Sequence, residues 1–274
     1  MFAPNEIAQN VIGIGKKKAS LSACKMFLLG IMAGMFIAMA AVGANTASCL
    51  IENPGIAKLV SGATFPVGLI MVLIAGSELF TGNSLIIVSV LAGEVKISQM
   101  LKNWLFVYLG NMVGSMLVAG ICCAAGQYDL FAGVLAVTTI KTAAAKCSLD
   151  FGKAILLGFM CNIFVCVAVW MSFGAKTVGG KIAAIFMPVM MFVVCGFEHC
   201  VANMYYIPAG LFALLNPQYA ELSADVSNVA NLTWGNFFAR NLLPVTIGNV
   251  LGGVIMVGVM YWLIYLKKEK TVKF

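Results

Sequence analysis

Charged residues are scarce in this chain of 274 residues: they make up 10% of it, whereas hydrophobic residues make up 62%. A soluble domain carries about 25% charged residues, so the composition argues against a soluble protein. Apolar runs of about 18 residues or more are long enough to cross a membrane. We count six such runs, at 26–51, 57–93, 104–125, 154–174, 182–215 and 242–266. The sequence therefore predicts an all-α integral membrane protein with six transmembrane helices.

Histidine is nearly absent, because His199 is the only one in the chain. A single histidine without a paired CxxC cluster is a poor set of zinc ligands, and we expect neither a metal nor a cofactor. Most of the nine cysteines lie in or beside apolar runs, where a thiol usually packs as a small side chain. The N-terminus also lacks a short apolar core with a cleavage site. Residues 1–24 are expected to form a cytoplasmic amphipathic segment instead.

The basic residues are divided unevenly between the two sides of the membrane. With a cytoplasmic N-terminus, twelve lysines lie inside, and five basic residues lie outside: Lys58, Lys141, Lys146, Lys153 and Arg240. The positive-inside rule then predicts that both termini are cytoplasmic, in the plasma membrane. Anionic lipid headgroups account for the net charge of +7, and no nucleic-acid partner is needed.

Three sequence blocks recur in the same order in the two halves of the chain. The matches are "KMFLLGIMAGMFIAMA" (25–40) with "KAILLGFMCNIFVCVA" (153–168), "GSELFTGN" (76–83) with "GFEHCVAN" (196–203), and "NWLFVYLGNMVG" (103–114) with "NLLPVTIGNVLG" (241–252). Each half has three apolar runs, an odd number, so the second half enters the membrane from the opposite side. This predicts an inverted 3+3 repeat.

The repeat divides the chain into successive segments. We expect a first repeat at 25–125, an extracytoplasmic connecting loop at 126–152, a second repeat at 153–266 and a cytoplasmic tail at 267–274. All of them belong to one transmembrane domain.

The second and fifth apolar runs are much longer than the roughly 20 residues needed to cross the membrane. Each contains a Gly-x-Glu interruption, with Glu78 or Glu198, followed five residues later by Asn83 or Asn203. Helix breaks at membrane depth are tolerated where the backbone is buried in protein or lines a cavity. We predict two broken helices facing a pore. A glutamate at such a break can accept hydrogen bonds from exposed backbone amides, which is the role expected of Glu78, and Glu198 could instead orient its neighbour His199. The alternative is a long tilted helix with a chance glutamate.

Two further polar residues are candidates for a functional role. His199 titrates near neutral pH without perturbation and can donate a hydrogen bond to an anion, although it could also be an ordinary buried histidine. Lys146 lies in the expected connecting loop. It could concentrate anions at a pore mouth or be a solvated surface lysine.

The segments "SELFTGN", "CNIFVCVAVW", "FEHCVANMYYIP" and "PVTIGNVLGG" resemble signatures of the formate/nitrite transporter family over nearly the whole chain. The resemblance implies an aquaporin-like fold and a homopentamer in the bilayer with one pore per protomer. It implies a substrate pathway along His199, Lys146, Thr81, Asn162 and Glu198. It also implies constrictions at Phe65, Leu69, Leu79, Val165 and Phe192, and support of the helix breaks by Glu78, Asn83, Asn203 and Asn249.

The resulting hypothesis is a channel for a small monovalent weak-acid anion: hydrosulfide, formate or nitrite. The loop "ELFTGNSL" most resembles the hydrosulfide-conducting branch. Lys146 would attract the anion, which would cross the constrictions with its charge neutralised by a proton near His199. A bare ion would lose its hydration there, at a cost on the order of 20 kcal/mol before relaxation.

Two other classes of function remain as alternatives. A water or glycerol channel is disfavoured by the lack of paired Asn-Pro-Ala loops and by the intramembrane glutamates. An integral membrane enzyme could use Glu198 and His199 in acid–base chemistry. The sequence offers no nucleophile motif or cofactor loop for it.

Overall fold

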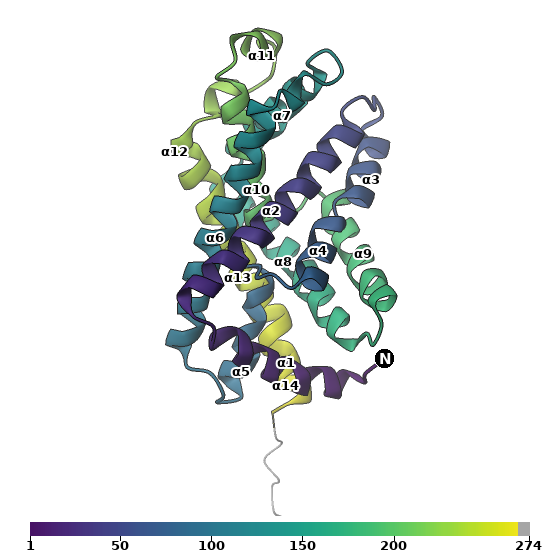
Figure 1. Cartoon of the computed structure of the whole chain (residues 1–274), viewed down its shortest axis with the longest axis vertical. Coiled ribbons are helices and arrows are strands. Elements are labelled where there is room, and N and C mark those ends of the chain that lie inside the picture. Colours follow the sequence, from purple (N-terminus) through teal and green to yellow (C-terminus); the bar gives the residue numbers. More distant parts are fainter. Residues whose placement is uncertain (268–274) are drawn as a thin grey trace, which may run out of the picture.

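The computed structural model describes residues 1–267, and every regular element in this range is helical (Figure 1). The first half contains α1 (Pro4–Ala19), α2 (Ala23–Ser48), α3 (Pro54–Thr64), α4 (Val67–Ala75), η1 (Gly82–Leu85), α5 (Ile86–Leu91), α6 (Ile97–Ala124) and η2 (Gln127–Asp129). The second half contains α7 (Val134–Cys147), α8 (Phe151–Gly174), α9 (Val178–Val194), α10 (Cys200–Ala213), α11 (Pro217–Leu222), η3 (Val229–Asn231), α12 (Trp234–Asn236), η4 (Phe237–Leu242), α13 (Leu243–Leu251), η5 (Gly252–Val259) and α14 (Met260–Tyr265). The expected tail at 267–274 lies outside the described residues except for Lys267.

Six membrane-crossing segments are present, as predicted. Four are continuous: α2, α6, α8 and the helical run 234–265, which includes the π-helical η4 and η5. The other two are broken. One consists of residues 54–75 followed by residues 82–91, and the other consists of α9 followed by α10. The N-terminal helix α1 lies across one end of this bundle, beside α5 and α14, and α11 lies at the other end (Figure 1).

A glycine in a left-handed conformation begins each break. Gly76, with φ of 83°, ends α4, and Gly196, with φ of 71°, follows the end of α9. This conformation is strained for residues with a Cβ atom and is common at helix C-termini. The prediction of two broken helices is therefore confirmed. The sequence analysis did not anticipate a further interruption at Pro66, which separates α3 from α4.

The expected connecting loop at 126–152 is mostly helical. It contains η2 and the 14-residue helix α7, so Lys146 lies in the last turn of a helix rather than in a loop. One side of α7 is buried, through residues that include Leu135, Ile140 and Ala144, and the helix packs against α10. The prediction failed because residues at helical spacing, and not a long apolar run, give this helix its buried face.

The two halves also pack in the same way, which supports the inverted repeat. The helix pair α2 and α6 in the first half corresponds in the second half to α8 packed against α13 and the following η5. A Cβ atom added to Gly114 would lie 2.1 Å from the Ile31 carbonyl oxygen, and one added to Gly252 would lie 2.1 Å from the Phe159 carbonyl oxygen. Glycine at these positions lets the helix backbones approach closely, as is typical of membrane interfaces.

Candidate functional site

Glu78 is the centre of a buried polar network at the first helix break. Its carboxylate accepts a hydrogen bond from Lys18 Nζ at 2.9 Å and one from Asn83 Nδ2 at 2.7 Å. Asn83 Nδ2 also donates to Asn103 Oδ1 at 2.8 Å. The Glu78 side chain is 9% exposed, so an unpaired carboxylate at this position would be very costly.

Glu198 is the centre of the same network at the second break. Its carboxylate accepts from Lys146 Nζ at 2.8 Å and from Asn203 Nδ2 at 2.6 Å. Asn203 Nδ2 also donates to Asn241 Oδ1 at 2.7 Å. These three contacts of the first break therefore have counterparts in the second, with one lysine from a helix end bound to each carboxylate.

Asn111, on α6, holds the backbone of the first break. Its Oδ1 accepts from the Phe80 N–H at 2.9 Å, and its Nδ2 donates to the carbonyl oxygens of Gly30 at 2.8 Å and Glu78 at 3.0 Å. The side chain is fully buried. One amide thus satisfies two backbone groups of the break, the Phe80 N–H and the Glu78 carbonyl, and ties them to the Gly30 carbonyl of α2.

Asn249, on α13, does the same at the second break. Its Oδ1 accepts from the Cys200 N–H at 2.9 Å, and its Nδ2 donates to the carbonyl oxygens of Gly158 at 2.7 Å and Glu198 at 2.9 Å. The prediction that Glu78 binds the exposed backbone amides is therefore wrong. Amide side chains have both donors and an acceptor, so they can satisfy N–H and C=O groups together, whereas an ionised carboxylate only accepts.

His199 lies between the second break and Thr81 of the first. Its Nδ1 accepts from the Ala202 N–H at 3.1 Å and so caps α10, while its Nε2 lies 2.9 Å from Thr81 Oγ1. A backbone N–H can only donate, so Nδ1 carries no proton and the neutral ring has its proton on Nε2. His199 therefore donates to the Thr81 hydroxyl, whose own proton remains available to another acceptor.

One aromatic ring stacks on this histidine, and a second packs against the first. The Phe192 ring stacks on the His199 ring, with centroids 5.9 Å apart and an interplanar angle of 29°. Phe65 meets Phe192 edge-on, with centroids 5.8 Å apart. All three side chains are buried. The structure thus brings two of the expected constriction residues into one group with His199.

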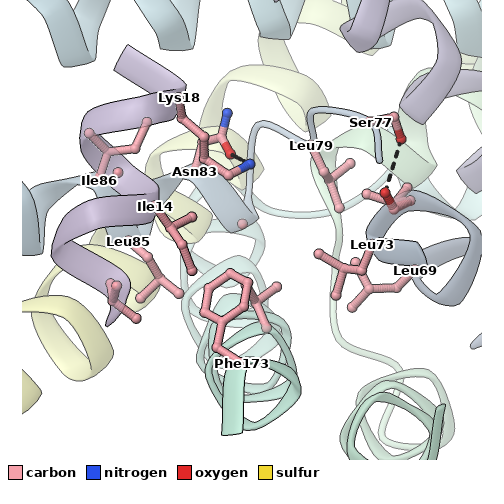
Figure 2. Close-up of a pocket in the computed structure, with 15 residues that line it drawn as sticks. Ile14, Lys18, Leu69, Leu73, Ser77, Leu79, Asn83, Leu85, Ile86 and Phe173 are labelled. Carbon is pink, nitrogen blue, oxygen red and sulfur yellow. Dashed lines mark hydrogen bonds between the residues drawn. The ribbon is translucent and has the colours of Figure 1, made fainter. Parts of the chain in front are cut away.

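Leu69 and Leu79 line a narrow cavity of about 20 Å³ beside the first break. Figure 2 shows them facing Lys18 and Asn83 across this cavity. Ile14 and Lys18 of α1 form part of its wall, so the N-terminal helix closes one side. The fifth expected constriction residue, Val165, is buried on α8.

Asn162, which the resemblance places on the substrate pathway, is held by groups of η1 and α13 and by the backbone of the first break. Its Nδ2 lies 3.2 Å from the carbonyl oxygen of Thr81, 3.2 Å from Ser84 Oγ and 2.6 Å from the carbonyl oxygen of Asn249. Asn162 therefore links the first break to α13. Lys146 binds Glu198, and the side chains of Glu198 and His199 have different partners.

The sequence analysis missed four residues of these networks: Lys18, Asn103, Asn111 and Asn241. A signal for Lys18 was present, because "KASLSACK" (18–25) matches "KCSLDFGK" (146–153) in Lys, Ser, Leu and Lys. The first aligned block began at Lys25 and stopped short of it. The three asparagines lie in the third aligned block. Within residues 1–267, no group of three or more His, Cys, Asp or Glu side chains is arranged to hold a metal ion.

Comparison with known proteins gives consistent matches over nearly the whole chain. Residues 5–263 match the family model described as formate/nitrite transporter. The chain is 38% identical over 274 residues to the formate channel FocA of Escherichia coli strain K12, covering 98% of this chain and 96% of that channel. It is 42% identical over 238 residues to FocA of Haemophilus influenzae, covering 85% and 84%. Its fold is similar to that of a solved pentameric formate channel with formate bound, with a TM-score of 0.80 and 39% identity over 89% of this chain and 98% of that one.

Proposed function

Because this chain belongs to the formate/nitrite transporter family, we propose that it is a membrane channel for formate and assembles as a homopentamer with one substrate path in each protomer. Both of these relatives are formate channels, and a similar solved structure is a pentamer with formate bound. They are channels rather than enzymes. The excess of lysines on one side supports a plasma-membrane orientation with both termini in the cytoplasm.

The observation that carries the proposal is the arrangement around His199. The His199–Thr81 pair is buried beside the ring of Phe192, which Phe65 meets edge-on, and one half-buried lysine is bound at each helix break. A small anion would meet a cation at either end and apolar side chains with a few hydrogen-bond donors between them.

Each lysine has a physical role in this scheme. An ammonium group at the edge of an apolar path raises the local concentration of anions. Lys146 lies at one end, and Lys18 lies in the wall of the cavity at the other (Figure 2). Because each ammonium is already paired with a glutamate, its field attracts an anion without trapping it in a deep energy well.

The central step follows from the cost of desolvation. A bare formate ion entering the apolar region would lose its hydration, on the order of 20 kcal/mol before relaxation, whereas formic acid carries no net charge. We infer that the anion takes up a proton from water at the edge of the apolar region and crosses as the neutral acid. The Nε2–H of His199 and the hydroxyl of Thr81 offer directional donors along the way.

His199 is not assigned as the proton donor. Protonation at Nδ1 would set that proton against the Ala202 N–H, which now donates to Nδ1, and would remove the cap of α10. We propose that His199 stays neutral and donates hydrogen bonds. This refines the hypothesis that a proton neutralises the anion near His199.

The test is a flux assay on purified protein in liposomes. Labelled formate, nitrite, hydrosulfide and glycerol are compared at several pH values, with a pH-sensitive dye inside the vesicles. We expect formate flux that is accompanied by proton movement and increases as the pH falls. Flux of glycerol without formate would favour a neutral-solute channel, and hydrosulfide flux without formate would assign the chain to another substrate.

A further inference from the structure

Lys18 and Lys146 occupy equivalent places in the repeat but use their ammonium groups differently. Lys18 Nζ donates to two side-chain acceptors, Glu78 Oε1 and Asn83 Oδ1, at 2.9 Å each. Lys146 Nζ donates to one side-chain acceptor in the described part of the chain, Glu198 Oε1, at 2.8 Å. Since an ammonium group has three donors, Lys146 retains one more than Lys18.

The backbones of the two lysines do not explain this difference. The Lys18 carbonyl oxygen accepts from Asn103 Nδ2 at 3.2 Å, and the Lys146 carbonyl oxygen accepts from Asn241 Nδ2 at 3.0 Å. Both helix ends are therefore held in the same way by an asparagine. The difference is confined to the ends of the lysine side chains.

The acceptor that Lys146 leaves unused is buried. Asn203 Oδ1 corresponds to Asn83 Oδ1, yet it has no hydrogen-bond partner among residues 1–267. Asn203 is fully buried, and an unpaired amide oxygen in such a place is unfavourable. Some other interaction must therefore hold the Lys146 ammonium away from this oxygen.

Tyr206 lies beside the Lys146 ammonium. The Lys146 Nζ lies 5.3 Å from the centroid of the Tyr206 ring, within the range of a cation–π interaction. Tyr206 is three residues after Asn203 on α10, so both side chains lie on the same face of this helix. The position 120 residues earlier, by the spacing that relates Glu78 to Glu198, is Ile86. Isoleucine has no ring face to attract a cation.

We propose that Tyr206 is a positioning residue that holds the Lys146 ammonium over its ring, away from Asn203 Oδ1, so that this ammonium keeps a free N–H donor for an incoming anion. The inference rests on the proposed function, since it assigns anion binding to Lys146. It predicts that the channel binds formate more tightly at the Lys146 end than at the Lys18 end.

The experiment compares the two sides of the membrane. Initial formate influx is measured in intact cells, where Lys146 faces the medium in the proposed orientation, and in inside-out vesicles from the same cells, where Lys18 faces it. We expect a lower KM in intact cells for the wild-type chain. Tyr206→Ile should raise that KM about threefold to tenfold, as expected for losing a partly desolvated cation–π interaction. It should leave the KM in vesicles nearly unchanged.

Tyr206→Phe is the matched control, because it keeps the ring and removes only the hydroxyl. It should retain the wild-type KM, and a rise as large as that of Tyr206→Ile would overturn the role of the ring. Replacement of Tyr206 by phenylalanines with one, two and three ring fluorines preserves the shape and weakens the ring's attraction for a cation. A stepwise rise in KM in intact cells is expected even if Tyr206→Ile fails to fold, and a constant KM across the series would overturn the proposal.

Flux measurements on the wild-type chain distinguish a failure of this inference from a failure of the proposed function. Formate flux with equal KM values on the two sides would overturn the inference and leave the channel function standing. Absence of formate flux in both preparations would overturn the proposed function itself, and the inference with it.

Discussion

The two helix breaks share one supporting network but differ in the side chains nearest the proposed path. Each break has a buried glutamate paired with a lysine, and each has an asparagine that binds three backbone groups. The residue after the glutamate, however, is Leu79 in the first break and His199 in the second. The lysines also differ in their second contact, which is Asn83 for one and Tyr206 for the other.

The sequence has to meet two requirements, support of the helix breaks and a suitable lining of the path. A break at membrane depth needs partners for its freed backbone groups wherever it occurs, so both halves need the same amides and ion pairs. The side chains that face the path are under no such constraint and can diverge. Differences between the halves therefore point to transport, whereas the shared contacts support stability and, at the two lysines, can serve transport as well.

The largest losses of stability are expected when the Lys18–Glu78 or the Lys146–Glu198 ion pair is broken. Because the two breaks share this pair, the losses should be about equal. Lys18→Met or Lys146→Met leaves a buried carboxylate without its cation, and each should destabilise the protein by about 3–5 kcal/mol. The double variants Lys18→Met/Glu78→Gln and Lys146→Met/Glu198→Gln remove both charges and should recover most of this stability. Denaturation in mild detergent measures these changes.

Formate flux then shows whether the lysines attract the anion as well as stabilise the fold. The neutral double variants should be folded but should carry much less formate, because the attraction for the anion is gone. A stable double variant with wild-type flux would show that the pair acts only in stability, and the proposed role of that lysine would have to be abandoned.

The asparagines should also have equal effects. Asn111→Ala and Asn249→Ala each leave three backbone groups without their side-chain partner, at about 1–3 kcal/mol for each group that water does not reach. We expect losses of at least about 2 kcal/mol for both, measured by the same denaturation assay. Ser115→Ala serves as a control on α6, since its hydroxyl bonds to Gly34 and Val201 are longer, at 3.2 and 3.5 Å. A loss at only one break would contradict their equivalence.

A smaller effect is expected where the halves differ, at His199. Asparagine is a good N-cap residue, so His199→Asn should preserve the start of α10 and lose only the Nε2–H donor to Thr81. Its stability should lie within about 1 kcal/mol of wild type, while its formate flux and the pH dependence of that flux should change. His199→Ala, which lacks the cap as well, should be the less stable of the two. Wild-type transport by a folded His199→Asn channel would reduce the histidine to a capping residue.

Much of this architecture could be predicted from the sequence, because it is encoded in local patterns. The lengths of the apolar runs gave the spans, and the Gly-x-Glu interruptions gave the breaks at Gly76 and Gly196. The repeat could be found because its blocks align without gaps. His199 attracted attention because a polar ring is unusual in such an apolar stretch.

The partners of the polar groups could not be predicted in the same way. Lys18 and Glu78 are 60 residues apart in the chain, and nothing in either local sequence indicates that α1 folds under the break. The choice between a glutamate and an asparagine as the backbone ligand depends on which side chain points toward the freed N–H. Likewise, the place of Lys146 over Tyr206 depends on how α7 packs against α10.

The smallest effect is expected at Glu94. This residue tests whether formate flux depends on every ion pair of α1 or only on the Lys18–Glu78 pair. Lys16 Nζ lies 2.7 Å from Glu94 Oε2, but both side chains are well exposed, at 63% and 46%. The hydrogen bond and the charge of Lys16 lower the pKa of Glu94 below its ordinary value of 4.5. A lowered pKa means that the pair adds stability above the ordinary pKa, and that this contribution is lost as the pH falls through the lowered value.

Glu94→Gln should therefore be slightly less stable than wild type at neutral pH, and equal to it once the pH lies below the lowered pKa. High salt should remove the difference at neutral pH as well, since exposed pairs are screened. Formate flux should not change, in contrast to the variants of the buried Lys18–Glu78 pair on the same helix. Thermal unfolding across a pH series, with and without salt, gives the comparison. A loss of flux in Glu94→Gln at neutral pH would mean that the exposed Lys16–Glu94 pair also fixes the position of α1. The Lys18–Glu78 pair would then not be sufficient to hold this helix in the cavity wall.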